Sequence, residues 1–531
     1  MRLRSRRTLA FLTCFTLAAL TLQGCSKAPS STTAKVTGGT VQGSESGKII
    51  TFKGIPYAAP PVGDYRWRSP QPVPKWQGIK QVDHYAPDCM QKPFVDDAAP
   101  LATLPAEDCL YLNVIRPAKQ SEAGYPVVVW FYGGGFVNGG ASAEVYSGDS
   151  FAKQGVVFVS FNYRLGRFGF FAHPALSTFE NDALGNYAIM DQIAALKWVK
   201  NNIAEFGGDP NQVTIMGESA GGKSVHAMLQ APGSQGLFNK AIVMSGGGRE
   251  LFNLLPLHSD NQQVLSAEQV GINFAAQHQI TGSDQSSLKA LRELPAQAIV
   301  GNLNLSTLKQ ENDSLVTYSG GPILDGTLIT STNSENLLNG QFSKVPLMVG
   351  TTSHDIGNAN FASKQALFDS FADNAKQAQV AYDPENNKPL AQLNYQVGQD
   401  KLMQEPARFT AQRFSKSGQN AYLYRFAYVA QTLNVKGAAH ASEIPYFFNT
   451  VVTKYGHVTT EQDKQAGKTM HRYVTNFIKT GNPNGPGLIN WQPFQQAPKA
   501  ILELNNSGIA EFVTDPLGLR LNATQAKVKQ H

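Results

Sequence analysis

From about residue 125 onwards, stretches with the apolar pattern of strands alternate with stretches that have the apolar spacing of helices. Continuous apolar runs rich in β-branched residues predict buried strands at 125–135, 156–166 and 211–217. Between the second and third runs, residues 186–208 repeat apolar side chains at helical spacing and end in Gly-Gly, which predicts a helix. Strands that are buried on both faces and alternate with helices indicate an α/β fold with a parallel sheet.

The same pattern continues towards the C-terminus with two interruptions. Further strand candidates are NKAIVMSGG (239–247), VPLMVG (345–350) and AYLYRFAY (421–428). The stretches 251–315 and 358–420 are longer, more polar and rich in helical patterns, which predicts insertions or lid elements. We therefore expect a single domain over residues 36–525.

Residues 1–24 have the pattern of an export signal. Four arginines precede an apolar stretch that ends near Leu22 and is too short for a transmembrane helix. The Leu-Gln-Gly-Cys sequence at this point resembles a bacterial lipobox, in which the cysteine is lipidated, and Ser26 fits outer-membrane sorting. We expect a lipoprotein anchored to the outer membrane through Cys25, with 25–35 as a polar tether. An ordinary cleaved signal, which would give a soluble periplasmic or secreted protein, is the alternative.

Composition and charge limit the classes of function. The chain of 531 residues is 42% hydrophobic and 16% charged, as expected of a globular protein with a large core. Its formal net charge of +6 falls to +2 without the signal, because 41 Lys and Arg and 39 Asp and Glu then remain. Nucleic acid is therefore not an expected partner. Beyond the lipobox two cysteines remain, Cys89 and Cys109, which in an exported protein indicate one disulfide rather than a zinc site.

The sequence GESAG at 217–221 is the strongest local signal for chemistry. The pattern G-x-S-x-G is weak alone, but here an apolar strand precedes it and a helical pattern follows. This context predicts that Ser219 sits on a tight turn with its hydroxyl exposed; a helix N-cap is the alternative role. A nucleophilic serine needs a base and an oxyanion site, and the glycines of YGGGF (132–136) can turn N–H groups towards a negative charge.

Several motifs together resemble the type-B carboxylesterase family, the cholinesterase-like branch of the α/β-hydrolases. The resemblance covers nearly all of residues 36–515 and rests on the order and spacing of FKGIPYAAPPVGDYRW, EDCLYLNV, YGGGF, FNYRLGRFGF, GESAGG and GNPN followed by W-x-P. It implies an α/β-hydrolase fold, an ester substrate, and no metal or cofactor. The positions that it implies are the nucleophile Ser219, the oxyanion donors Gly134, Gly135 and Ala220, the electrostatic residue Glu218, and the disulfide partners Cys89 and Cys109.

His440 is the candidate base. It lies in GAAHASEIPYFF, which resembles the family's histidine loop, and it follows the strand candidate 421–428. His457, His471 and His531 lie further along the chain in polar sequence without such a motif. His226 is only seven residues after Ser219, and we expect it to lie on the helix and to point elsewhere.

The acid is expected between the nucleophile and the base, because the chain order in this fold is Ser, then Asp or Glu, then His. Asp355 in VGTTSHDIG lies five residues after the glycine that ends the strand candidate 345–350, where the family has its glutamate. It departs from the family in two ways, since aspartate is one methylene shorter and Ile356 replaces the usual glycine.

Two other residues, Asp325 and His354, are alternative candidates for the acid and the base. Asp325 in GPILDGTL is the rival acid, although Asp-Gly is also a turn pair. His354 is next to Asp355 in sequence, and we expect it to belong to the loop structure because adjacent side chains rarely point to one site.

These assignments predict a serine carboxylesterase that hydrolyses small-molecule esters through a Ser219–His440–Asp355 triad and an acyl-enzyme. The alternatives are a weakened or inactive binding protein of the same family, and a lipase acting on longer acyl chains. A cholinesterase is less expected, because residues 90–108 contain no tryptophan that could bind a quaternary ammonium.

Overall fold

The structure, a computed structural model, describes residues 31–94, 97–180, 182, 184–249, 254–308 and 315–528. The predicted signal, Cys25 and His531 lie outside these residues. The described residues from Thr32 onwards belong to one compact unit. Within the described ranges, no helix is both long enough and apolar enough to cross a membrane.

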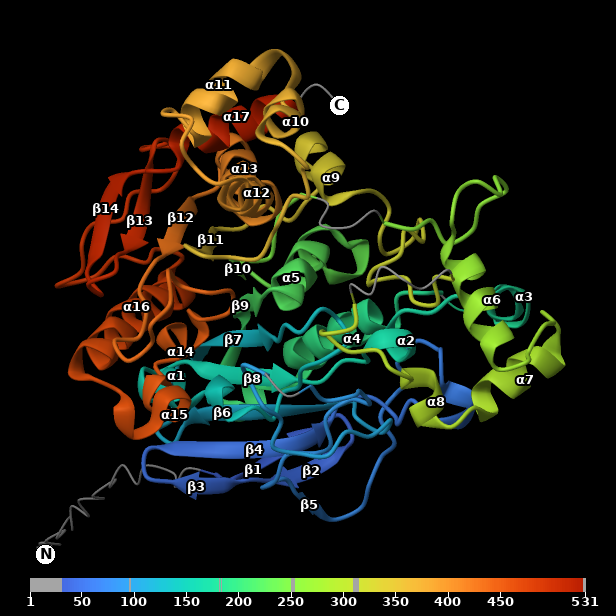
Figure 1. Ribbon diagram of the computed structural model, residues 1–531. Coiled ribbons are helices and arrows are strands. Elements are labelled where there is room, and N and C mark those ends of the chain that lie inside the picture. Colours follow the sequence, from blue (N-terminus) through green and yellow to red (C-terminus); the bar gives the residue numbers. More distant parts are fainter. Residues whose placement is uncertain are drawn as a thin grey trace, which may run out of the picture. The chain divides into compact units, whose positions relative to one another are not determined.

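Eleven strands of the described chain form the main sheet, in the order β14-β13-β12-β11-β10-β9-β7-β8-β6-β4-β3 (Figure 1). The pairs from β13 through to β8 are parallel, and the pairs at the two ends are antiparallel, so the expected mostly parallel sheet is confirmed. The strands are β3 (Ser44–Ser46), β4 (Ile49–Pro56), β6 (Tyr111–Pro117), β7 (Tyr125–Phe131), β8 (Val157–Phe161), β9 (Gly208–Glu218), β10 (Lys240–Met244), β11 (Leu347–Thr352), β12 (Ala421–Phe426), β13 (Ala500–Leu504) and β14 (Ala510–Thr514).

The continuous apolar runs of the central strands follow from burial on both faces of the sheet. Every residue of β8, β10 and β11 is buried, so these strands show no apolar-polar alternation. A separate three-stranded sheet near the start of the chain joins β1 (Thr33–Val36), β2 (Gly39–Gln42) and β5 (Ile79–Gln81).

Helices cover both faces of the main sheet. Helices α4 and α5 pack on the central strands from one side, and α16 packs on β7 and β9 from the other (Figure 1). The helices before the first insertion and at the C-terminal end are α1 (Asp149–Lys153), α2 (Gly166–Gly169), α3 (Pro174–Phe179), α4 (Tyr187–Asn202), α5 (Ala220–Gln230), α14 (Ile444–Phe447), α15 (Val451–Tyr455), α16 (Glu461–Thr480) and α17 (Gly518–Val528).

The two polar stretches that the sequence sets apart are helical, as expected. Their helices and the one between them are α6 (Ala267–Gln277), α7 (Gln285–Glu293), α8 (Ala296–Val300), α9 (Asn333–Asn339), α10 (Lys364–Asp369), α11 (Ala375–Tyr382), α12 (Leu390–Gln399) and α13 (Glu405–Lys416). A π-helical turn, Asp400–Gln404, joins α12 to α13. Because α13 packs directly on β11 and β12, the end of 358–420 belongs to the layer that covers the sheet rather than to a lid.

The helix expected over 186–208 is shorter in the structure. Helix α4 ends at Asn202, and a 3-10 turn over Ile203–Phe206 follows it. Gly207 then adopts a left-handed conformation with φ 73°, and β9 begins at the second glycine of the pair.

The parallel strands β9, β10, β11 and β12 all present their carboxyl ends at the same edge of the sheet. In open α/β sheets this edge is where loops converge and ligands bind. The residues that follow these four strands are therefore the ones that can form a site.

Candidate active site

Ser219 is the single residue between β9 and α5. Its backbone has φ 57° and ψ −122°, a strained conformation for a residue with a side chain. A Cβ atom at Gly217 would lie 2.3 Å from the carbonyl oxygen of Gly221, and one at Gly221 would lie 1.9 Å from the carbonyl oxygen of Phe131. The two flanking glycines are thus required for the turn, which has the geometry expected of a nucleophile elbow.

The structure brings Ser219, His440 and Asp355 together in one chain of hydrogen bonds. The Ser219 Oγ lies 2.8 Å from the Nε2 atom of His440, and the Nδ1 atom of His440 lies 2.6 Å from Oδ1 of Asp355. His440 comes from the loop after β12, and Asp355 from the loop after β11. The candidate base is within hydrogen-bond reach of the candidate nucleophile, and the candidate acid contacts the other ring nitrogen.

The loops that carry the acid and the base are joined to each other by their backbones. The N–H of His354 donates to the carbonyl of Ala438 at 2.8 Å, and His354 forms an isolated parallel bridge with Ala439. The imidazole of His354 packs on the ring of Tyr395, with centroids 4.4 Å apart. His354 therefore contributes loop structure, as expected, rather than a second base.

Asp355 is buried and accepts four hydrogen bonds. Its Oδ1 accepts from His440 and from the N–H of Ile356 at 2.8 Å, and its Oδ2 accepts from the hydroxyl of Ser245 at 2.7 Å and the N–H of Thr352 at 3.1 Å. Burial alone would raise the pKa of Asp355, but His440 and these donors lower it below its usual range. The carboxylate therefore stays charged beside the imidazole.

Neither departure from the family pattern separates Asp355 from His440. Strand β11 continues two residues past Gly350, which carries the acid towards the imidazole, so the shorter side chain still reaches it. Ile356 is 43% exposed, and its N–H donates to the carboxylate of Asp355.

Two further carboxyl groups lie beside His440. Oε1 of Glu218 is 3.3 Å from the Nε2 atom of His440, and Oε1 of Glu443 is 3.5 Å from the Ser245 hydroxyl. Burial raises the pKa of both glutamates, and the charge of Asp355 adds to this. The charge of Glu218 raises the pKa of Glu443 further, whereas His440 opposes the rise at both groups. Burial would lower the pKa of His440, but Glu218 first, then Asp355 and Glu443, raise it above its ordinary value. These groups titrate as a unit, because each negative charge favours the imidazolium.

The loop after β7 lies against the nucleophile elbow. A Cβ atom at Gly133 would lie 3.0 Å from the Cβ of Ser219, and one at Gly134 would lie 2.2 Å from the carbonyl oxygen of Asn138. Gly134 and Gly135 have φ of 112° and 63°, conformations that favour glycine. Among the hydrogen bonds between described residues, none uses the N–H groups of Gly134, Gly135 or Ala220. These three amides remain the candidate oxyanion donors.

The other residues that the sequence singled out make contacts that stabilise the fold. Asp325 accepts three backbone N–H groups, at 2.8–2.9 Å, in the turn that it begins. The imidazole of His471 is buried, with its Nδ1 atom 2.7 Å from the carbonyl of Phe447. Cys89 and Cys109 form the expected disulfide. Among the described residues, no cluster of His, Cys, Asp and Glu has the arrangement of a metal site.

Comparison with known proteins identifies the family of the chain. Residues 30–516 match the model of the carboxylesterase family. The chain belongs to this family. The esterase is 33% identical to the fumonisin B1 esterase of Sphingopyxis macrogoltabida over 86% of this chain and 84% of that protein. It is also 33% identical to the para-nitrobenzyl esterase of Bacillus subtilis (strain 168), over 88% of this chain and 94% of the relative.

The comparison extends to a mammalian relative and to a solved structure. Carboxylesterase 1E of Rattus norvegicus is 32% identical over 86% of this chain and 88% of its own. A solved structure of PNB esterase superposes with a TM-score of 0.78 at 30% identity, over 92% of this chain and 99% of the other. The expected α/β-hydrolase fold is confirmed, and the esterase is a carboxylic ester hydrolase.

Sequence reasoning missed Ser245 and Glu443 as part of this site of the esterase. Ser245 is the first residue after β10, where its φ of 45° turns the hydroxyl towards Asp355. A lone serine after a strand carries no pattern that would distinguish it. Glu443 lies in the same motif as His440, three residues later, so that motif could have indicated it.

Replacing Glu218 by glutamine is expected to move the acid limb of the kcat/KM–pH profile of the esterase to lower pH. The charge of Glu218 favours the imidazolium and raises the pKa of His440, so its removal lowers that pKa. A base must be neutral to accept a proton, and activity is lost as pH falls through its pKa. A lower pKa therefore moves the loss to lower pH.

The matched control is Glu293→Gln on the exposed side of α7, which should leave the acid limb in place. The kcat/KM–pH profile is measured with one ester for both variants and for the unaltered chain, and the acid limbs are compared. A shift of the Glu218→Gln limb to higher pH would contradict this electrostatic role.

Proposed function

We propose that the chain hydrolyses carboxylic esters through a catalytic triad of Ser219, His440 and Asp355 and a covalent acyl-enzyme. The observation that carries this proposal is the continuous path of hydrogen bonds from Oγ to Nε2, at 2.8 Å, and from Nδ1 to Oδ1, at 2.6 Å. It is supported by the strained elbow at the nucleophile and by the lowered pKa of the buried acid.

In the first half of the reaction, Nε2 of His440 takes the proton of the Ser219 hydroxyl as the oxygen attacks the ester carbonyl. The carbonyl π electrons move to the oxygen, and the N–H groups of Gly134, Gly135 and Ala220 stabilise that negative charge. Asp355 keeps the Nδ1 proton of His440 in position and stabilises the imidazolium. The carbon–oxygen bond to the alcohol then breaks, and the leaving oxygen takes the proton from Nε2.

In the second half, water takes the place of the alcohol. His440 removes one proton from the water as its oxygen attacks the acyl carbon, and the tetrahedral intermediate is held by the same N–H groups. The bond between Ser219 Oγ and the acyl carbon breaks, Ser219 recovers a proton from Nε2, and the carboxylic acid leaves. No step requires a redox or metal centre.

A partition experiment tests the acyl-enzyme directly. The purified chain is given phenyl acetate or 4-nitrophenyl acetate in water that contains added methanol, and methyl acetate and acetate are measured. Because both substrates form the same acetyl-enzyme, the ratio of the two products is expected to be the same for both. A product ratio that changes with the leaving group would contradict a common covalent intermediate.

We also propose that the chain is exported and held at the outer membrane by a lipid on Cys25, on the basis of the lipobox resemblance alone. Growth with labelled palmitate is expected to label the unaltered protein and not a Cys25→Ala variant. A soluble and unlabelled wild-type product would contradict the anchor and favour an ordinary cleaved signal.

A further inference from the structure

The acid loop, residues 353–358, follows β11 and carries Asp355, and it lies directly against helix α12. A Cβ atom at Gly398 on this helix would lie 2.4 Å from the Cα atom of Asn358, and one at Gly357 would lie 2.6 Å from the carbonyl group of Gly398. Gly357 also has a φ of 135°, which favours glycine. The two backbones are thus so close that neither glycine has room for a side chain.

Two side chains from the same part of the chain hold the backbone on either side of the acid. The hydroxyl of Tyr395 on α12 donates to the carbonyl of Asp355 at 2.7 Å. The amide of Gln404, which is buried, donates to the carbonyl of Thr352 at 2.7 Å and accepts from the hydroxyl of Thr351 at 2.6 Å. Thr351 and Thr352 are the two residues by which β11 extends towards the imidazole.

The π-helical turn between α12 and α13 allows Tyr395 and Gln404 to face the same loop. They are nine residues apart, about two and a half turns of an α-helix, so an uninterrupted helix would place them on opposite faces. In the structure the N–H of Glu405 donates to the carbonyl of Asp400, five residues earlier instead of four. This wider turn brings Gln404 back to the face of Tyr395. Single π turns inside α-helices are frequent at functional sites.

Buried ion pairs fix both ends of the π turn. At its first residue, Asp400, the guanidinium of Arg520 donates to both carboxylate oxygens, at 2.8 and 2.7 Å. Directly after the turn, both carboxylate oxygens of Glu405 accept from Arg249, at 2.6 and 2.8 Å. Bidentate pairs of this kind fix orientation as well as position. Gln404 is therefore held between two rigid points of the chain.

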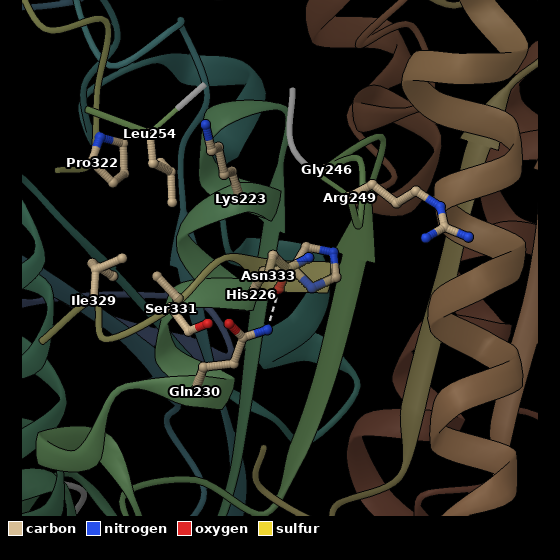
Figure 2. Close-up of a pocket in the computed structure, with 11 residues that line it drawn as sticks. Lys223, His226, Gln230, Gly246, Arg249, Leu254, Pro322, Ile329, Ser331 and Asn333 are labelled. Atoms are coloured by element: carbon tan, nitrogen blue, oxygen red, sulfur yellow. Dashed lines mark hydrogen bonds between the residues drawn. The ribbon is translucent and has the colours of Figure 1, made fainter. Parts of the chain in front are cut away.

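The loop after β10 contacts both the acid and the π turn. Arg249 and Gly246 of this loop belong to the lining of a pocket of about 500 Å³ beside α5 (Figure 2). The guanidinium of Arg249 turns away from the other lining residues (Figure 2) and reaches Glu405 instead. Gly246 directly follows Ser245, whose hydroxyl donates to Asp355. The acid and the turn beside its loop are thus held by one common segment.

We propose that Gln404 is a positioning residue for the acid, and that the π turn keeps Asp355 at hydrogen-bond distance from His440. The inference rests on the proposed function, because it assumes that Asp355 acts as the acid. Gln404 acts through Thr352, whose carbonyl it holds and whose N–H donates to the carboxylate of Asp355 at 3.1 Å. An aspartate has one methylene fewer than a glutamate, so its reach depends closely on where its backbone is held.

Replacing Gln404 by methionine tests this inference. Methionine has a similar length but can replace neither the hydrogen bond to Thr352 nor the one from Thr351. We expect kcat for 4-nitrophenyl acetate to fall by about 10- to 100-fold with little change in KM, as for a catalytic group displaced by about 1 Å. Steady-state kinetics on the purified full chain measures both parameters.

The same variant should move the acid limb of the kcat/KM–pH profile to lower pH. Glu218 first, then Asp355 and Glu443, raise the pKa of His440 against the effect of burial. A looser contact with Asp355 weakens its contribution alone, so the pKa of His440 falls. Because activity is lost as pH falls through this pKa, the loss then occurs at lower pH.

Gln412→Met on α13 is the matched control. Its side-chain oxygen accepts from Gln525 at 2.8 Å, away from the acid loop, so this variant should keep both kcat and the acid limb. A merely structural role of Gln404 would reduce the amount of active enzyme and scale the profile without moving it. An acid limb that does not move in Gln404→Met therefore overturns the inference, whatever the value of kcat.

If Gln404→Met does not fold, Tyr395→Phe decides. This change removes the hydroxyl that donates to Asp355 and keeps the ring that packs on His354. We expect kcat to fall by about 3- to 10-fold, as for the loss of one hydrogen bond, and the acid limb to move in the same direction. An unmoved limb in Tyr395→Phe would overturn the inference.

The outcomes also separate this inference from the proposed function. If Asp355→Asn loses activity while Gln404→Met retains the kcat and the acid limb of the unaltered chain, the inference alone fails. If Asp355→Asn retains near-normal turnover, or if hydrolysis does not depend on Ser219, the proposed triad fails and the inference fails with it.

Discussion

Replacing Ser219 by alanine is expected to lower kcat for 4-nitrophenyl acetate by about 10⁵- to 10⁶-fold, with little change in KM. The variant keeps the proposed oxyanion amides and the imidazole but has no oxygen to attack the carbonyl or to carry the acyl group. Its residual rate should come from electrostatic stabilisation and binding alone. Steady-state kinetics on freshly purified protein, with the spontaneous rate subtracted, measures the loss.

Ser224→Ala on the same helix is the matched control for this change. Ser224 is buried like the nucleophile, but its hydroxyl donates to the carbonyl of Ala220 and accepts from Gln192, away from the imidazole. Its effect on kcat should be small by comparison. If Ser219→Ala retains more than about one per cent of activity, another residue is the nucleophile.

Replacing Asp355 by asparagine is expected to lower kcat by about 10³- to 10⁴-fold, the second-largest effect. Asp355 accepts from Nδ1 of His440 at 2.6 Å and from the Ser245 hydroxyl at 2.7 Å through its two oxygens. Asparagine has one oxygen and one donating amide group, so it cannot accept at both positions. An amide that donates to Nδ1 would hold the imidazole in the tautomer that has its proton on Nε2, where it cannot act as a base.

Asp325→Asn is the control, because this aspartate caps backbone N–H groups in a turn. It should lower the thermal stability of the protein more than its kcat. Near-normal turnover in Asp355→Asn together with a large loss in Asp325→Asn would reverse the assignment of the acid.

The sequence alone points to Ser219 and His440 as the candidate nucleophile and base, because each lies in a local pattern. A strand, a crowded glycine turn and a helix follow one another in the sequence around Ser219, and the backbone strain at that residue follows from this order. The parallel sheet could be predicted for the same reason, since burial on both faces leaves continuous apolar runs in β8, β10 and β11.

What could not be predicted depends on contacts between distant segments. The fit of Asp355 requires the two extra residues of β11 and the hydroxyl of Ser245, which is 110 residues away in the chain. The packing of α13 on the sheet likewise depends on tertiary contacts, because its amphipathic pattern is equally compatible with a lid. The side-chain directions in the pocket beside α5 also depend on tertiary contacts, so the sequence alone could not predict which residues line it.

The central claim, that Ser219 is the residue that carries the acyl group, is tested most directly by active-site labelling. The purified chain is titrated with diethyl 4-nitrophenyl phosphate, which transfers its phosphoryl group to an activated serine and releases nitrophenol. Peptide mass spectrometry then locates the label while residual esterase activity is followed. The expected result is a label on Ser219 alone, rising in proportion to the activity lost and absent from His440→Ala. A fully labelled Ser219 in an active protein, or inactivation with the label on another residue, would contradict the account.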